Sequence, residues 1–217
     1  MSLKQDRRVF LAALSGVAAL APSARAQQAP APRPAAAPID VSWFDAFKGK
    51  HKQVFDLGSF DLAVDSPLRQ PVTYFAGHRE VSKLEPPDDV NVIVGISHKA
   101  FAMNAGDALW AKYKLGQHWG IKDPSTGAPA TRNIFLGEGA RAGGATVRGL
   151  QARGVIFWQC NFALGSVAAD LAQAVSGKPD EVRADLLAGL VSGVRLVPAH
   201  TWALGHVQEH GFTYEKL

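Results

Sequence analysis

The chain has 217 residues, 47% of them hydrophobic, and a formal net charge of +4. Residues 1–26 carry most of this excess charge, so the rest of the chain is nearly neutral. No basic run with interleaved aromatic residues is present, which argues against nucleic acid as a partner. The one cysteine, Cys160, excludes a disulfide within the chain.

The N-terminus has the layout of an export signal. A basic start over residues 4–8 precedes an apolar run over residues 9–21, and Ala-Arg-Ala at residues 24–26 matches a signal cleavage site. The apolar run is too short for a transmembrane helix. The string DRRVFL at residues 6–11 favours a twin-arginine signal over an ordinary secretory signal with two arginines. We therefore expect cleavage after Ala26, a periplasmic mature protein and no membrane association after cleavage.

Composition divides the chain into three parts. Residues 1–26 form the expected signal peptide. Residues 27–38, QQAPAPRPAAAP, have the composition of an extended, semi-rigid spacer. Residues 39–217 are long enough for one folded domain with a sizeable core.

Strand and helix patterns alternate along this domain. The clearest strand is VNVIVGI at residues 90–96, a continuous apolar run typical of a strand covered on both faces. Further strands are expected at 52–58, 155–159, 194–197 and 212–217, and helices at 66–84, 104–115, 140–153, 163–175, 179–190 and 201–210. The alternation predicts a three-layer α/β sandwich with a mostly parallel five-stranded sheet.

Local signals set several boundaries and leave one long connection. Ser66 and Thr201 are expected N-caps, and Gly154 is expected to end the helix before the third strand. Residues 116–139 are rich in Gly, Pro, Asp and Thr and form a long connection. Its apolar residues, including Trp119, are expected to fold back over a site or into a subunit contact.

Polar residues follow three of the predicted strands. His98 follows the second strand, Cys160 ends the third and His200 follows the fourth. Because ligands of parallel sheets bind outside the carboxyl ends of the strands, these three residues are candidates for one site. Asn161 follows Cys160 directly and is a further candidate, either as a donor to a ligand or as a helix cap.

The position of Cys160 allows two interpretations. It lies just before a predicted helix, whose N-terminus carries partial positive charge and favours the reactive thiolate. A buried, inert cysteine that packs as a small hydrophobe is the alternative. His98 and His200 likewise have a second interpretation, as loop residues with satisfied hydrogen bonds.

Two histidines near the C-terminus have a metal-ligand spacing. His206 and His210 are four residues apart, so they share one helix face. The nearby Glu209 and the chain end indicate an exposed face, so a metal site here ranks below the thiol site. No cofactor is predicted from the sequence.

The second half of the chain resembles a known family. The strings LQARGVIFWQCNFAL and GLVSGVRLVPAHTWALGHVQEHGFTYEKL resemble the DsrE/DsrF-like family, also called YchN-like. The shared order is a strand ending in cysteine, a helix, a strand closed by proline, a helix and a Gly-aromatic ending. The resemblance implies a flavodoxin-like fold, homo-oligomers such as trimers or hexamers, and a sulfur-carrying role for Cys160 with a partner protein.

Two functional hypotheses follow, and they leave open whether the protein is an enzyme. In the first, a periplasmic sulfur-handling protein accepts sulfane sulfur on Cys160, with His98 and His200 tuning the thiol or positioning the ligand. In the second, a non-catalytic oligomeric module holds a small ligand, haem or a metal ion at the same edge of the sheet.

Overall fold

A computed structural model describes residues 38–58, 67–137 and 145–217. The expected signal peptide, nearly all of the linker and the expected cap Ser66 lie outside the described residues. The described strands are β1 (His51–Leu57), β2 (Val90–Ile96), β3 (Ile156–Cys160), β4 (Arg195–Val197) and β5 (Thr213–Lys216). They form one sheet in the order β4-β3-β2-β1-β5, and every pairing is parallel. The predicted three-layer α/β sandwich is confirmed, and the described sheet is wholly rather than mostly parallel.

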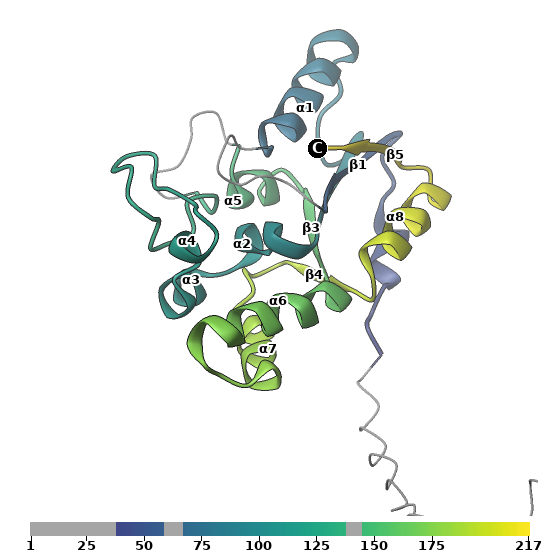
Figure 1. The fold of residues 1–217 in the computed structure, drawn as a ribbon. Helices are drawn as coiled ribbons and strands as arrows, with labels where there is room; N and C mark the ends of the chain where they lie inside the picture. Colours follow the sequence, from purple (N-terminus) through teal and green to yellow (C-terminus); the bar gives the residue numbers. More distant parts are fainter. Residues whose placement is uncertain (1–37, 59–66, 138–144) are drawn as a thin grey trace, which may run out of the picture. The chain divides into compact units, whose positions relative to one another are not determined.

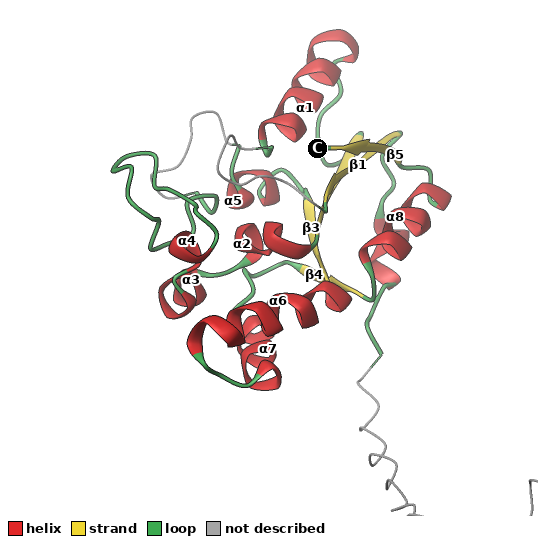
Figure 2. Ribbon diagram, in the orientation of Figure 1, coloured by secondary structure: helices red, strands yellow, loops and turns green. Residues whose placement is uncertain are grey.

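Helices cover both faces of the sheet (Figures 1 and 2). One face packs against α8 (His200–Glu209) and a 3-10 helix over Ser42–Ala46. The other face carries a short 3-10 helix over His98–Ala100 and the remaining α-helices, which are α1 (Arg69–Ser82), α2 (Phe101–Asn104), α3 (Asp107–Tyr113), α4 (Leu115–His118), α5 (Val147–Gln151), α6 (Asn161–Val175) and α7 (Pro179–Ala188). In the described ranges, no helix combines the length and the apolar character needed to span a bilayer.

Strand alternation divides the buried residues into two cores. Successive side chains of a strand point to opposite faces. Accordingly, Val54 and Ile93 belong to the smaller core beneath α8, whereas Phe55 and Val94 belong to the larger core on the other face. In β3, Trp158 lies on the α8 side and Phe157 on the other. This alternation also decides which polar side chains of the strands face α8.

The sheet has a topological switch point beside β1. From β1 to β4 each new strand is added on the same side, but β5 pairs with the opposite edge of β1. In open α/β sheets, ligands bind outside the carboxyl ends of the strands at such a point. A ligand site is therefore expected at the carboxyl ends of β1, β5 and their neighbours.

Several helix boundaries differ from the sequence prediction, three of them for reasons visible in the structure. Of the helix expected over 140–153, the structure shows α5 (Val147–Gln151), and residues 138–144 lie outside the described residues. The helix begins after Thr146, whose side chain caps it by accepting a hydrogen bond from the Gly149 N–H at 3.0 Å. The expected helix over 104–115 is interrupted at Ala105, whose extended backbone forms an isolated bridge with Leu190. The helix predicted from Thr201 begins one residue earlier, with Ala199 at the cap position.

The long connection after α4 is part of the core. Ile121, Ile134 and Phe135 are buried in it, as apolar side chains in a long loop suggested. Asn133 holds the connection by donating from its amide to the carbonyl oxygens of Met103 at 2.9 Å and Ala105 at 2.7 Å. These hydrogen bonds satisfy a buried polar side chain and fix the loop against the end of α2.

Candidate functional site

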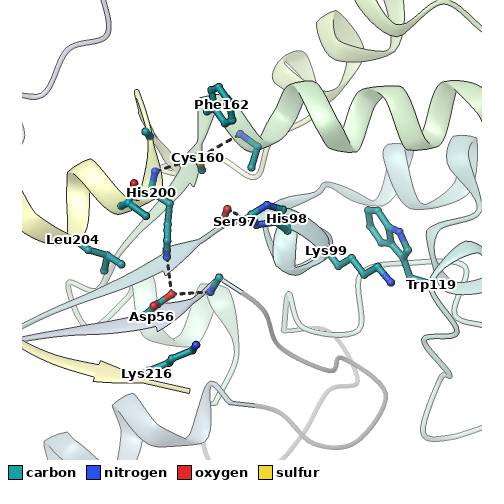
Figure 3. A pocket seen from close by; sticks show the side chains of 14 residues that line it. Asp56, Ser97, His98, Lys99, Trp119, Cys160, Phe162, His200, Leu204 and Lys216 are labelled. Carbon is teal, nitrogen blue, oxygen red and sulfur yellow. Dashed lines mark hydrogen bonds and ion pairs between the residues drawn. The ribbon is translucent and has the colours of Figure 1, made fainter. Parts of the chain in front are cut away.

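The carboxyl ends of the strands border a cavity of about 960 Å³, which we call the rim pocket (Figure 3). Its polar residues come from several elements: Asp56 and Gly58 at the end of β1, Ser97 and His98 after β2, Cys160 at the end of β3, and His200 at the start of α8. The structure therefore brings Cys160, His98 and His200 to one cavity, as their positions after parallel strands predicted.

Cys160 lies where two helices begin. Its Sγ accepts a hydrogen bond from the backbone N–H of Ala163 in α6 at 3.3 Å and another from the backbone N–H of His200 in α8 at 3.2 Å. Both donors are free N–H groups of a first helical turn, which carries partial positive charge. The residue is only 3% exposed, yet it lines the rim pocket. The two donors thus direct partial positive charge at the sulfur.

The imidazole of His200 has a partner at each nitrogen. Its Nε2 lies 2.6 Å from Asp56 Oδ1, and its Nδ1 lies 3.1 Å from Trp158 Nε1. An indole N–H can only donate, so Nδ1 is the acceptor and Nε2 carries the proton that Asp56 accepts. Both nitrogens are thus engaged away from Cys160, and His200 contacts the sulfur through its backbone.

Asp56 anchors this group of residues. Burial is the largest single influence on its carboxyl and would raise the pKa. Hydrogen bonds from His200 and from the Tyr214 hydroxyl, the latter at 2.8 Å, outweigh burial and hold the pKa of Asp56 below its ordinary value. The backbone N–H of Gly58 adds a further bond at 2.7 Å. The carboxylate form is therefore the stable one inside the fold.

His98 and Lys99 form another side of the rim pocket, with Trp119 beyond them (Figure 3). His98 has a backbone φ of +47°, a left-handed conformation that is unusual outside glycine, and its Nδ1 pairs with Ser97 Oγ at 2.9 Å. Trp119 donates from Nε1 to Asp170 at 3.3 Å. Trp119 thus folds back over the site, one of the two roles predicted for the long connection.

Asn161 lies away from the rim pocket. Its side-chain oxygen accepts a hydrogen bond from Arg183 of α7, and the residue does not line the cavity. The cap of α6 is instead Cys160 itself, whose sulfur accepts from the helix. The structure therefore separates Asn161 from the three residues that the sequence grouped with it.

The pair His206 and His210 lies in an aromatic cluster on α8. His206 stacks on Trp202 with ring centroids 4.7 Å apart, and His210 pairs with Asp45 at 3.2 Å. Within the described ranges, no group of three or more His, Cys, Asp or Glu side chains is arranged to hold a metal ion. The described residues thus offer no built site for the metal alternative.

Sequence reasoning did not find Asp56, Trp158 or Lys216 as site residues. Asp56 carried a usable signal, because it is a lone carboxylate near the end of the apolar strand KQVFDLG. Lys216 pairs in register with Asp56 across β1 and β5. Its place at the site depends on the strand order, which the sequence did not reveal.

No protein-family model matches this chain, and no curated protein matches it. Among solved structures, the chain is similar to a protein of unknown function, MTH1491, from Methanobacterium thermoautotrophicum. The two share 15% identity with a TM-score of 0.37, over 77% of this chain and 99% of that one. A likeness at this level carries no argument about function. The resemblance to the DsrE/DsrF-like family therefore stays a prediction.

Proposed function

We propose that the protein handles sulfur and that Cys160 carries a sulfane sulfur atom as a persulfide. The observation that carries this proposal is the pair of N–H donors from two helix starts on the sulfur of Cys160, at the wall of the rim pocket. Preorganised N–H groups of this kind stabilise an anionic sulfur without any change in structure during the reaction.

The cavity supports the same proposal through its size and charge. A volume of about 960 Å³ lies within the usual range of small-molecule sites. Lys99 and Lys216 line it from different sides and bring positive charge to its opening. A small anionic sulfur compound, such as an inorganic polysulfide, fits this combination of cations and a thiolate.

The transfer needs no external oxidant. The Cys160 thiolate attacks a sulfane sulfur of the polysulfide and forms one S–S bond. The S–S bond on the far side of that atom breaks, and the shortened polysulfide leaves with the electron pair. An acceptor thiolate then attacks the outer sulfur of the persulfide, and Cys160 leaves as thiolate.

Mass spectrometry of the intact protein after polysulfide treatment tests the proposal. We expect one added sulfur on Cys160, lost on treatment with a reductant. The matched control is Cys160→Ser, which removes the only thiol of the chain. An unmodified wild-type protein would remove the sulfur-carrying role.

A binding module without a covalent step is the second candidate. It is favoured by the low exposure of Cys160, 3%, and by the apolar wall that Trp119, Phe162 and Leu204 give the rim pocket. Calorimetric titration with polysulfide or sulfite distinguishes the two. Equal affinity of wild type and Cys160→Ser, without added mass on the wild type, supports binding alone.

We further propose that the mature protein is exported and forms homo-oligomers. Phe162, which lines the rim pocket and is 80% exposed, is the side chain that we propose contacts a second copy of the chain. Light scattering coupled to size exclusion is expected to give a trimer or hexamer for wild type and a smaller species for Phe162→Asp. A monomeric wild type would contradict the expected assembly.

A further inference from the structure

We propose that Asp56 and Trp158 are positioning residues for Cys160 that act through His200, which they hold as the neutral tautomer protonated at Nε2. The consequence for sulfur chemistry rests on the proposed function, but the tautomer itself does not. His200 is then not the base that removes the thiol proton. Its contribution is a backbone N–H aimed at the sulfur.

The hydrogen bonds allow one arrangement of protons. Trp158 Nε1 has no lone pair to accept with, so its contact at 3.1 Å requires a bare Nδ1 on His200. The remaining proton is on Nε2, 2.6 Å from Asp56 Oδ1. A second proton on Nδ1 would place two N–H groups against each other in a buried setting. Asp56 accepts two further hydrogen bonds, from the Gly58 N–H on the same oxygen Oδ1 and from the Tyr214 hydroxyl on Oδ2.

Asp56 and Trp158 act on Cys160 through a single residue, His200. His200 is the first residue of α8, and its own backbone N–H donates to Cys160 Sγ at 3.2 Å. With its ring held at both nitrogens, His200 has little freedom to rotate or shift. Figure 3 shows the chain of contacts from Asp56 through the His200 ring to the backbone beside Cys160. The start of α8 is thereby fixed relative to the sulfur.

The sequence makes room for this network at two glycines. A Cβ at Gly95 of β2 would lie 2.6 Å from the Trp158 ring, so only glycine lets the indole lie across β2. A Cβ at Gly58 would lie 3.1 Å from Asp56 Oδ1 and 3.3 Å from His200 Nε2. Glycine is therefore required at Gly95, whereas a Cβ at Gly58 would make tight contacts with Asp56 and His200.

Nitrogen NMR of the full-length chain with labelled histidines tests the tautomer directly. The chain has seven histidines, and His200→Gln identifies the signal of interest. Near neutral pH we expect Nε2 of His200 to be protonated and Nδ1 to be bare. Trp158→Phe, which removes the N–H donor, is expected to mix the two tautomers. Protonation of wild-type His200 at Nδ1, alone or together with Nε2, overturns the proposal.

Alkylation of Cys160 by iodoacetamide separates positioning from base catalysis. Asp56→Ala and Trp158→Phe are expected to slow alkylation about fivefold, the equivalent of roughly one hydrogen bond. Asp56→Asn keeps an acceptor for Nε2–H and is expected to slow alkylation less than Asp56→Ala. His200→Gln keeps the backbone N–H but loses the ring that holds it, so it is expected to slow alkylation about as much as Trp158→Phe. A base role predicts instead that His200→Gln is the slowest of the four.

The outcomes of the two proposals can be told apart. Circular dichroism and urea unfolding first establish that each variant is folded. If the tautomer and the alkylation pattern are as expected but no persulfide forms, the positioning role stands and the sulfur-carrying role fails. If persulfide forms but His200→Gln abolishes alkylation while Asp56→Ala does not slow it, the positioning role fails alone.

Discussion

At Cys160, burial and hydrogen bonding act in opposite directions. Burial at 3% exposure disfavours an anion, because it removes water from the charged form. The two N–H donors restore part of that solvation at fixed positions. Both donors are backbone groups, so a substitution of the Ala163 or His200 side chain does not remove the donor itself. Whether Cys160 is inert or reactive therefore depends on which molecules can enter the rim pocket and reach its sulfur.

Asp56 is expected to make folding stability depend on acid pH. The folded-state pKa of Asp56 is lowered, so its carboxylate stabilises the fold above the unfolded-state pKa, and this contribution is lost as the pH falls through the folded value. Asp56→Asn is expected to lower the free energy of unfolding at neutral pH by about 1–2 kcal/mol, since it weakens charge-assisted hydrogen bonds in a buried site.

Urea unfolding at several pH values measures this effect. Between about pH 5 and pH 3 the stability of wild type is expected to fall more steeply than that of Asp56→Asn. The exposed Glu80→Gln in α1 controls for the loss of one carboxylate. Parallel curves for wild type and Asp56→Asn would show that Asp56 is not stabilised as a carboxylate.

At the scale of elements, the alternation of strand side chains assembles the site. Asp56, Trp158 and Cys160 all lie on the face of the sheet that packs against α8, since each contacts His200. Gly95 belongs to the same face, between β1 and β3. A shift of one residue in any of these strands would turn its site residue to the opposite face.

Substitution of Gly95 by alanine tests how tightly the sheet and Trp158 pack. The added Cβ would lie 2.6 Å from the indole, so Gly95→Ala is expected to destabilise the protein by about 1–3 kcal/mol. It should also displace Trp158 from His200. Thermal or urea unfolding, together with the near-ultraviolet spectrum of the tryptophans, reports both effects.

Gly205 in α8 supplies the matched control. A Cβ there meets no atom within 4 Å, and the residue lies inside a helix. Gly205→Ala is therefore expected to stabilise the protein by about 0.5–1 kcal/mol through helix propensity. Similar effects of the two alanines would contradict the close packing at Gly95.

At the scale of residues 38–217, the two faces of the sheet are unequally supported. The larger core contains buried side chains from all the helices α1 to α7. The smaller core contains buried side chains from α8 and from the segment around Phe44. The site is built between β3 and α8, at the thinner layer. Ligand sites are often drawn from the less stable parts of a fold.

Hydrogen exchange is expected to reflect this asymmetry. Amides of β2, whose seven residues are all buried, should exchange most slowly. Amides of α8 and of the fully exposed edge strand β5 should exchange faster than those of β2. Mass-spectrometric peptide exchange measures this order, and equal protection of α8 and β2 would show that the thinner layer does not open separately.

The sequence predicted much of this architecture, for identifiable reasons. The apolar run of β2 and the regular spacing of strands and helices set the parallel sheet, and the positions of Cys160 and His200 after strands set the edge where they meet. The strand order and the His200 tautomer depend on contacts between residues far apart in the chain, such as Asp56 with Tyr214. Asn161 was grouped with the site residues because it follows Cys160, but its hydrogen-bond partner is Arg183 on α7, 22 residues further along the chain.

The mass of Cys160 after exposure to inorganic polysulfide tests the sulfur-carrying role most directly. We expect one added sulfur on Cys160 in wild type, none in Cys160→Ser, and slower loading in Trp158→Phe. A wild-type thiol that stays unmodified while the protein remains folded would contradict this role.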